Sequence, residues 1–244
     1  MPKIVEVGFF NPRNPEEQYM VKERKVLEET LNELGVSCKH SPSKWPRDEY
    51  VFSNGTKLQS SEHGFYADGG YVLHNNNLTF VCNKVSETWN GEQTETIAER
   101  TEKLRNLYHN NIYMLPSPDP DMDDAICPHI DLMVLPISEK RIVFVDEIYL
   151  KRHQSYLTKT MGENKLRIIP VGDTRNQRYW PCNSLLISDK DNNRNQTVCI
   201  TAAPENSSFF KTLKEYNILP VRIPFSNNCK EGGSINCATN VYEK

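Results

Sequence analysis

The feature that most constrains the fold of this chain is an internal repeat of strand, strand, helix and strand. Runs rich in β-branched and aromatic residues alternate with segments whose apolar residues recur every three or four positions. The pattern occurs three times, with first strands predicted over 64–73, 130–137 and 184–188. The helices of these units are predicted over 92–108, 147–161 and 206–216. Such a pattern predicts an α/β fold of small units that each carry one helix.

The N-terminal residues predict a fourth unit. A strand is predicted over 3–10, and a helix over 16–34, where apolar residues recur at helical spacing until Gly35 ends it. A second strand is predicted over 36–40. A loop that contains two prolines follows it.

Three chemically distinctive residues follow the predicted loops at an even spacing. His129 and Asn183 lie 54 residues apart, as do Asn183 and Cys237, and Asp48 follows the first loop. If the repeats close on themselves, equivalent loop ends meet at one central axis. We therefore expect these side chains to share one pocket.

The composition excludes several classes of protein. The net charge of −3 gives no basic field that would hold a nucleic acid backbone. There is no apolar run of about 18 residues, which predicts no membrane span, and the first residues lack the apolar core of a signal peptide. Seven irregularly spaced cysteines fit reduced thiols in a cytoplasmic protein. The length of 244 residues predicts one catalytic domain over 1–244.

Four short motifs carry groups capable of chemistry. They are Arg47-Asp48, Asp68-Gly69-Gly70, His129-Ile130-Asp131, and Gly232-Gly233 followed after three residues by Cys237. In a strand that starts at 130, His129 and Asp131 are expected to lie on the same face. A guanidinium is a planar cation with five N–H donors, and carboxylates bind it through charge-assisted hydrogen bonds. A cysteine thiolate is a strong nucleophile toward its central carbon.

In order and spacing these motifs resemble those of the guanidino-group-modifying enzymes, which share the pentein fold. That superfamily contains arginine deiminases, agmatine deiminases, dimethylarginine dimethylaminohydrolases and amidinotransferases. The stretch 181–187 also resembles a strand of the agmatine deiminase branch. The resemblance implies an α/β propeller of five strand-strand-helix-strand blades with pseudo-fivefold symmetry and an active site on its axis.

The resemblance also implies roles for individual residues. Cys237 is the expected nucleophile, His129 the acid and base, and Asp68 the residue that orients His129. The expected substrate-binding residues are Asp48, Asp131, Arg47 and Asn183. No metal or organic cofactor is expected, and the expected partner is a small guanidino substrate, with a homo-oligomer left open.

The class of reaction rests on one departure from the family pattern. Most hydrolases of the superfamily carry Glu where this chain has Asp68, whereas amidinotransferases carry Asp. The small size of the chain favours a hydrolase that cuts a C–N bond of arginine, methylarginine, agmatine or peptidyl arginine, with an amidinotransferase as the alternative. A non-catalytic pentein fits less well, because such proteins lack the Cys/His set.

Other readings of single segments carry less weight. A zinc site from Cys127, His129, Cys229 and Cys237 matches no known ligand spacing. The acidic stretch 119–124 lacks the glycine and closing Glu of an EF-hand loop. Segments 41–63 and 116–128 are candidates for a lid over the site. Arg175 and Arg178 fit either a substrate carboxylate or a solvated loop.

Overall fold

Four three-stranded sheets of one topology make up most of the fold. The computed structural model describes residues 3–75, 78–85, 94–118, 129–172, 179–231 and 233–243. In each sheet the first strand pairs antiparallel with the second, and the second pairs parallel with the third. Three sheets are β5-β6-β7 (Val72–Asn75, Leu78–Cys82, Ile112–Leu115), β8-β9-β10 (Val134–Ile137, Ile142–Asp146, Arg167–Val171) and β11-β12-β13 (Leu185–Ile187, Val198–Thr201, Leu219–Arg222). The predicted repeat is thereby confirmed.

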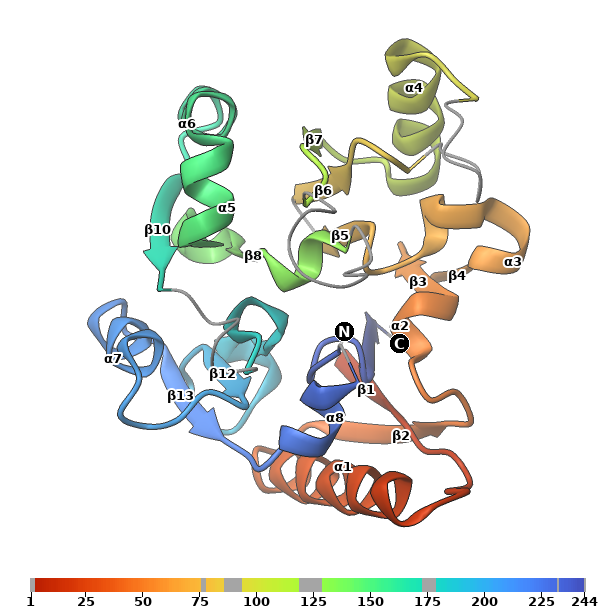
Figure 1. Cartoon of the computed structure of the whole chain (residues 1–244), viewed down its shortest axis with the longest axis vertical. Coiled ribbons are helices and arrows are strands. Elements are labelled where there is room, and N and C mark those ends of the chain that lie inside the picture. The colour runs from red at the N-terminus through yellow and green to blue at the C-terminus, as the bar shows by residue number, and fades with distance from the viewer. Residues whose placement is uncertain are drawn as a thin grey trace.

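The fourth sheet joins the two ends of the chain. Its order is β14-β1-β2 (Thr239–Glu243, Lys3–Gly8, Ser37–Ser41), so the last strand takes the place that the first strand has elsewhere. The two termini accordingly lie close together (Figure 1). A separate hairpin, β3-β4 (Tyr50–Ser53, Thr56–Gln59), lies between this sheet and the next in the chain.

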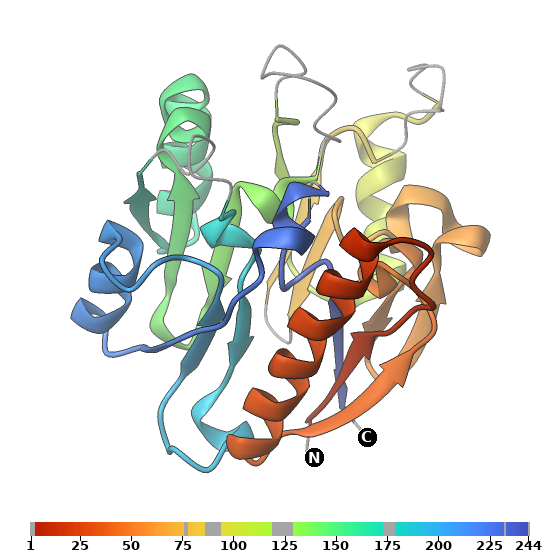
Figure 2. The same ribbon diagram turned by 60° about the horizontal axis from the view of Figure 1, so that its bottom comes forward.

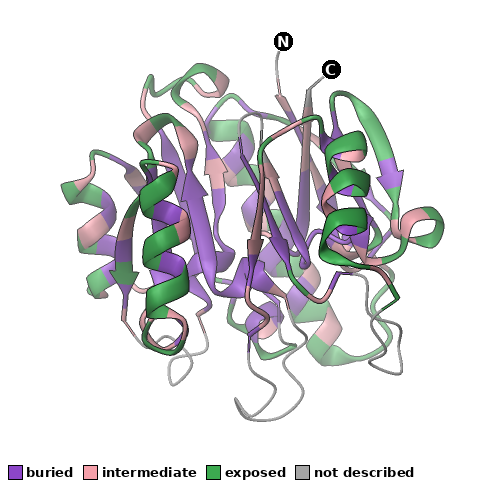
Figure 3. Ribbon diagram, turned by 90° about the horizontal axis from the view of Figure 1, so that it is seen from above, coloured by how far each residue is buried: buried purple, intermediate pink, exposed green. Residues whose placement is uncertain are grey.

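The helices lie outside the sheets. They are α1 (Pro15–Glu33), α4 (Ile97–Tyr108), α5 (Glu147–Arg152), α6 (Gln154–Glu163) and α7 (Ser208–Glu215). In Figure 1 they occupy the periphery, and in Figure 2 α1 covers the β14-β1-β2 sheet. Figure 3 shows mostly buried strands between helices whose outer faces are exposed, so the core lies between the sheets and the helices. No described helix is long and apolar enough to cross a membrane.

The sequence fixes where several helices begin. Asn14 accepts a hydrogen bond from the backbone N–H of Glu17, and Pro15 follows at the first helical position of α1. Thr96 and Glu99 form a reciprocal capping box at the start of α4. Ser207 caps α7 through the N–H of Phe210. These local signals explain why helices were predictable in every unit.

Two predicted first strands are wrong in their N-terminal halves. The segment 64–73 begins with a 3-10 helix, η1 (Gly64–Ala67), and β5 starts only at Val72. The segment 130–137 begins with η2 (Ile130–Leu132), and β8 starts at Val134. Both segments are rich in aromatic and aliphatic residues, and a short run of this kind does not distinguish a strand from a short helix. His129 and Asp131 are therefore not alternate residues of one strand.

Further short helices escaped prediction, and one predicted helix is split. The unpredicted ones are α2 (Pro46–Glu49), α3 (Ser60–His63), η3 (Ser138–Lys140), η4 (Pro181–Asn183), η5 (Asp189–Asp191) and α8 (Ser226–Lys230). The helix predicted over 147–161 breaks at His153 into α5 and α6. Residues 86–93, which include the predicted start of the second helix, lie outside the described residues.

Removal of the last strand tests its part in the fold. A chain that ends at Ala238 loses all five β1–β14 residue pairs and leaves β1 as an open edge. We expect its melting temperature to fall by about 10 °C or more, because roughly 2–4 °C corresponds to 1 kcal/mol in a domain of this size. Thermal unfolding followed by circular dichroism measures the change.

A chain that ends at Tyr242 is the matched control, since it keeps the four pairs from Val7–Thr239 to Ile4–Tyr242. Its melting temperature should stay close to that of the whole chain. Equal melting of the two shortened chains would contradict a structural role for β14.

Candidate active site

The predicted site residues come together where the first strands of the sheets begin. Asp131, Asn183 and Cys237 form one hydrogen-bonded cluster. Asp48, Asp68 and His129 form a second, with donor and acceptor atoms within 4.8 Å of one another. The two clusters face each other closely enough that charge on Asp48 acts on Cys237. The resemblance therefore picked out residues that are neighbours in space.

The even spacing in sequence corresponds to equivalent structural positions for only two of the three residues. Asn183 and Cys237 each lie two positions before the strand that follows, at Leu185 and Thr239. His129 lies five positions before Val134, with η2 in between. The 54-residue interval from His129 to Asn183 is thus not a structural equivalence. His129 reaches the site from an earlier point of its loop.

Asn183 holds the nucleophile candidate in place. Its side-chain Nδ2 donates to Cys237 Sγ at 3.1 Å and to Asp131 Oδ2 at 2.6 Å. Its Oδ1 accepts from the backbone N–H groups of Ser234 at 3.0 Å and Cys237 at 3.1 Å. A carboxamide offers two N–H donors and two acceptor lone pairs, and all four are used here. Asn183 thus positions the thiol, and its role in substrate binding stays a prediction.

Asp131 is buried, and its two carboxylate oxygens differ in the number of hydrogen bonds that they accept. Its Oδ2 also accepts from Asn236 Nδ2 at 3.2 Å and from the Cys237 thiol at 3.3 Å. Its Oδ1 has no hydrogen-bond partner among the described residues, and neither does the buried Oδ1 of Asp48. Buried acceptors without donors are rare, because each costs free energy. Two such oxygens beside a thiol mark a place where an N–H-rich group fits.

Two glycines allow the histidine and arginine to approach the turn after η1. A Cβ atom on Gly70 would lie 2.3 Å from the His129 ring, and one on Gly69 would lie 2.1 Å from Cγ of Arg47. The Gly70 N–H donates to Asp68 Oδ1 at 2.8 Å, and Nε2 of His129 lies 3.8 Å from that same oxygen. Only glycine fits at these two positions, which explains the Gly-Gly pair.

Arg47 lies behind this turn. Its Nε donates to the Gly69 carbonyl at 3.3 Å, and its own carbonyl accepts from the Gly69 N–H at 2.8 Å. It also lines a cavity of about 210 Å³ together with Asn236. That cavity borders the site without including Cys237 in its lining. The predicted role of Arg47 in substrate binding therefore stays a prediction.

Burial dominates the electrostatics of the site. It raises the pKa of Asp48 to about 7, where the positive charge of His129 opposes the rise and the negative charges of Asp68 and Asp131 add to it. Burial likewise raises the pKa of Asp68. The pKa of Cys237 lies well above its usual value because of burial first and the charges of Asp131 and Asp48 second. The site thus disfavours negative charge on these three groups.

The residues of the alternative metal and substrate sites are only partly described by the structure. Asp48, Asp68 and His129 lie close enough to hold a metal ion. In the zinc set, the Cys229 thiol donates to Ser234 Oγ at 3.4 Å, and Cys127 lies outside the described residues. The calcium candidate 119–124, the pair Arg175 and Arg178, and 119–128 of the predicted lid also lie outside them.

Sequence reasoning missed two contributors to the site. Asn236 supplies a donor to Asp131. Ser234 supplies a backbone N–H to Asn183. Both belong to the short segment between the glycine pair and Cys237. Their position next to the nucleophile candidate was the only available signal, since neither residue type stands out.

The fold is that of known guanidino-modifying enzymes. No family model and no curated protein sequence matches the chain. Among solved structures it resembles the arginine dihydrolase ArgZ of cyanobacteria (TM-score 0.68, 12% identity, 99% of this chain and 39% of that one). It also resembles agmatine deiminase from C. jejuni (0.63, 13%, 99% and 93%) and a dimethylarginine dimethylaminohydrolase adduct (0.64, 9%, 99% and 100%).

These matches confirm the predicted resemblance at the level of the fold, which is a mixed α/β arrangement of several small sheets similar to that of the pentein enzymes. The chain spans about two fifths of full-length ArgZ but 98% of a structure of its N-terminal domain.

Substitution of Gly70 tests the packing of His129. Gly70→Ala places a methyl group within 2.3 Å of the ring, so His129 has to move. We expect a loss of about 1–3 kcal/mol in the free energy of unfolding, as for other overpacked sites. We also expect a shift of the His129 ring signals in nuclear magnetic resonance spectra. Gly162→Ala in α6 is the control, because nothing lies within 4 Å of its Cβ position. Unmoved His129 signals in Gly70→Ala would contradict the contact.

Substitution of Asp48 tests the cost of burying its charge. Its pKa is raised from 3.8 to about 7, so ionising it costs the folded state free energy that grows as pH rises between those values. Asp48→Asn removes this cost. We expect it to stabilise the protein at pH 8 by about 2 kcal/mol, with a gain that shrinks toward pH 4.

Urea unfolding at several pH values measures the gain. Asp146→Asn is the control, because Asp146 is buried but accepts from the N–H groups of Ile148 and Tyr149, so no gain is expected. An Asp48→Asn variant less stable than the parent at pH 8 would refute the argument.

Proposed function

We propose that this protein is a hydrolase that cleaves a C–N bond of a guanidine through a covalent adduct on Cys237. The observation that carries the proposal is a pair of buried oxygens, one on Asp48 and one on Asp131, that have no hydrogen-bond partner among the described residues and belong to carboxylates that act on the Cys237 thiol. A guanidinium would supply both the positive charge and the N–H donors that these oxygens lack. The shared fold with guanidino-modifying enzymes supports the same substrate class.

Substrate binding would prepare the nucleophile. In the free protein, negative charge on Asp131 and Asp48 disfavours the thiolate of Cys237. A cation between the two carboxylates offsets that effect, so the thiol can lose its proton to solvent when substrate is bound and become the thiolate. Two hydrogen-bond donors already favour the thiolate of Cys237. They are the backbone N–H of Ser234 and the side-chain amide of Asn183. The thiolate sulfur then attacks the central guanidinium carbon.

His129 would carry the protons. As the S–C bond forms and the C–N bond breaks, the imidazolium gives its proton to the departing amine. The neutral ring then takes a proton from water, whose oxygen attacks the same carbon while the S–C bond breaks. The remaining hydroxyl proton passes to the departing sulfur, so the ureido product leaves and the thiol is restored. Asp68, 3.8 Å from Nε2, supports the charged ring during these steps.

An amidinotransferase is the second candidate, and Asp68 is the observation that favours it. The shorter side chain leaves 3.8 Å between carboxylate and imidazole, beyond hydrogen-bond distance. A transferase would use the same adduct and release it to an amine in place of water. The cluster around Cys237 argues against a non-catalytic pentein.

Finer expectations from the resemblance accompany this proposal. Four sheets of one topology support a blade-like arrangement, in which the β3-β4 hairpin would stand for a fifth blade. The five-bladed propeller, the single domain over 1–244, the cytoplasmic location and a homo-oligomer stay predictions.

A panel of guanidines tests the reaction. Arginine, methylarginine, agmatine and a peptidyl arginine are each incubated with the protein, and ureido product, ammonia and methylamine are measured. We expect turnover of at least one, with a Cys237 adduct visible by mass spectrometry after acid quench. Cys237→Ser should lose all turnover, whereas Cys229→Ser, a buried thiol outside the cluster, should keep it. Below pH 7, kcat/KM should fall about tenfold per pH unit as Asp48 takes up a proton.

Two results would change the conclusion. If no guanidine is consumed and a haloacetamidine does not label Cys237, the enzymatic proposal fails. If the amidino group passes to glycine or another amine without ureido product, the transferase is correct.

A further inference from the structure

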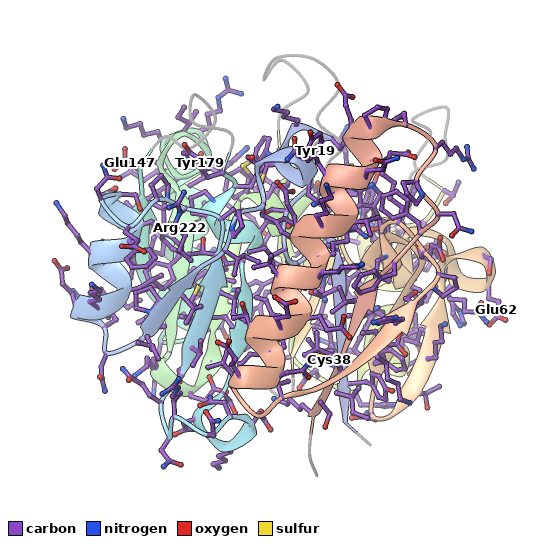
Figure 4. All side chains as sticks on the ribbon, turned by 90° about the horizontal axis from the view of Figure 1, so that it is seen from below. Tyr19, Cys38, Glu62, Glu147, Tyr179 and Arg222 are labelled. Atoms are coloured by element: carbon purple, nitrogen blue, oxygen red, sulfur yellow. The ribbon has the colours of Figure 1, made fainter. Side chains whose placement is uncertain are left out.

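A buried cation lies in α1 outside the set of residues discussed so far. Tyr19 points outward from this helix (Figure 4), and Arg24, five residues later, is fully buried. Its Nε donates to Asn228 Oδ1 at 2.9 Å, and its Nη1 donates to the carbonyls of Gly8 at 2.6 Å and Lys44 at 2.5 Å. Its Nη2 has no hydrogen-bond partner among the described residues.

The charge of Arg24 has no carboxylate partner close by. No ion pair of Arg24 occurs within the described ranges. The neighbouring Glu23 turns both oxygens to α8, where they accept from Asn227 and Asn228. The rings of Phe10 and Trp45 lie 5.1 and 4.9 Å from the guanidinium carbon. A fully buried guanidinium is costly without an anion, so the fold needs a reason to keep it there.

Arg24 is connected to the segment that carries Cys237 through Gly8. Gly8, whose carbonyl Arg24 holds, donates its N–H to the Ala238 carbonyl at 2.9 Å, next to the nucleophile candidate. Trp45, whose ring lies beside the guanidinium of Arg24, also packs against Gly233. A Cβ atom built on Gly233 would lie 3.0 Å from that ring and 3.2 Å from Cβ of Cys237. Arg24 is thus one layer of atoms away from the segment that carries the thiol.

We propose that Arg24 is a positioning residue that stabilises the thiolate form of Cys237 from behind the active site. The inference rests on the proposed function only in that the thiolate is taken to be the reactive form. Negative charge on Asp131 and Asp48 opposes the thiolate, and a fixed cation at Arg24, which reaches the Cys237 segment through Gly8, partly offsets it.

The electrostatics agree with this geometry. Burial lowers the pKa of Arg24 to about 9, and negative charge on Cys237, followed by Glu23, acts to raise it. Coupling between two sites is reciprocal, so if a thiolate favours the cation, the cation favours the thiolate by the same amount. The guanidinium stays charged at neutral pH, where the reaction would run.

The rate at which methyl methanethiosulfonate labels Cys237 tests the proposal, because this reagent reacts with thiolates and needs no guanidine turnover. Labelling at pH 8 is followed by mass spectrometry of the peptide that contains Cys237. Two neutral variants are used in case one does not fold: Arg24→Gln keeps an N–H donor at the level of Nε, which donates to Asn228 Oδ1, and Arg24→Met fills the space between the rings. We expect labelling about tenfold slower in either, which corresponds to a rise of one unit in the thiol pKa.

Two controls separate charge from packing. Arg24→Lys keeps a cation and should label within about threefold of the parent. Asn228→Ala breaks the tie between α1 and α8 but leaves Arg24 charged, so it should lower the melting temperature without slowing the labelling. Cys38, half-buried on β2 and labelled in Figure 4, reports general loosening within the same samples.

A purely structural role predicts the opposite sign, since a loosened fold exposes Cys237 and speeds its labelling. The proposal is overturned if the neutral variants are labelled at least as fast as the parent. It is also overturned if neither the parent nor the variants are labelled at all. A negative guanidine panel leaves this measurement unaffected, and an unchanged labelling rate leaves the hydrolase proposal standing, so the two can fail separately.

Discussion

The interaction on which the rest of the site depends is the pairing of Asp131 with Asn183 and Cys237. A fully buried carboxylate is costly, and three donors on one oxygen, two amides and a thiol, offset part of that cost. The remaining oxygen has no hydrogen-bond partner in the part of the chain that the structure describes. That asymmetry keeps Asp131 fixed in place and still available to a cationic ligand, which is the property a preorganised binding site requires.

The fold makes this pairing possible by repeating one sheet four times. Each first strand starts where the preceding loop approaches the centre, so Asp68, Asp131, Asn183 and Cys237 arrive from four different sheets. The Cys237 segment differs because its strand, β14, pairs with β1 at the other end of the chain. The nucleophile candidate is therefore positioned only when the two ends of the chain have met. Folding and site assembly are linked at that one sheet.

The repeat could be predicted from sequence because it rests on local signals, namely apolar periodicity and helix caps. The residues that meet at the site were chosen by the resemblance of their motifs; the structure brings them together, and their roles stay predictions. The local backbone conformation at the site could not be predicted from sequence. Aromatic and aliphatic residues gave 64–67 and 130–132 the apolar character of strands, although both form 3-10 helices that place Asp68 and Asp131. β14 was missed because its pairing depends on β1, more than 230 residues earlier. Arg24 was missed because a single arginine on a polar helix carries no signal until its burial is known.

The charges around Cys237 suggest why a buried thiol is kept rather than a hydroxyl. Asp48 and Asp131 raise the cost of the thiolate in the free protein, so the cysteine rests protonated and protected from oxidation. Under the proposed function, a cation between those carboxylates would remove the cost at the moment of binding. Arg24, in the role proposed for it, would add a constant contribution that keeps the remaining step small. A neutral molecule in the same pocket would not lower the pKa of the thiol. The proposed enzyme would therefore select cationic substrates in two ways, through its contacts with them and through the ionisation of Cys237.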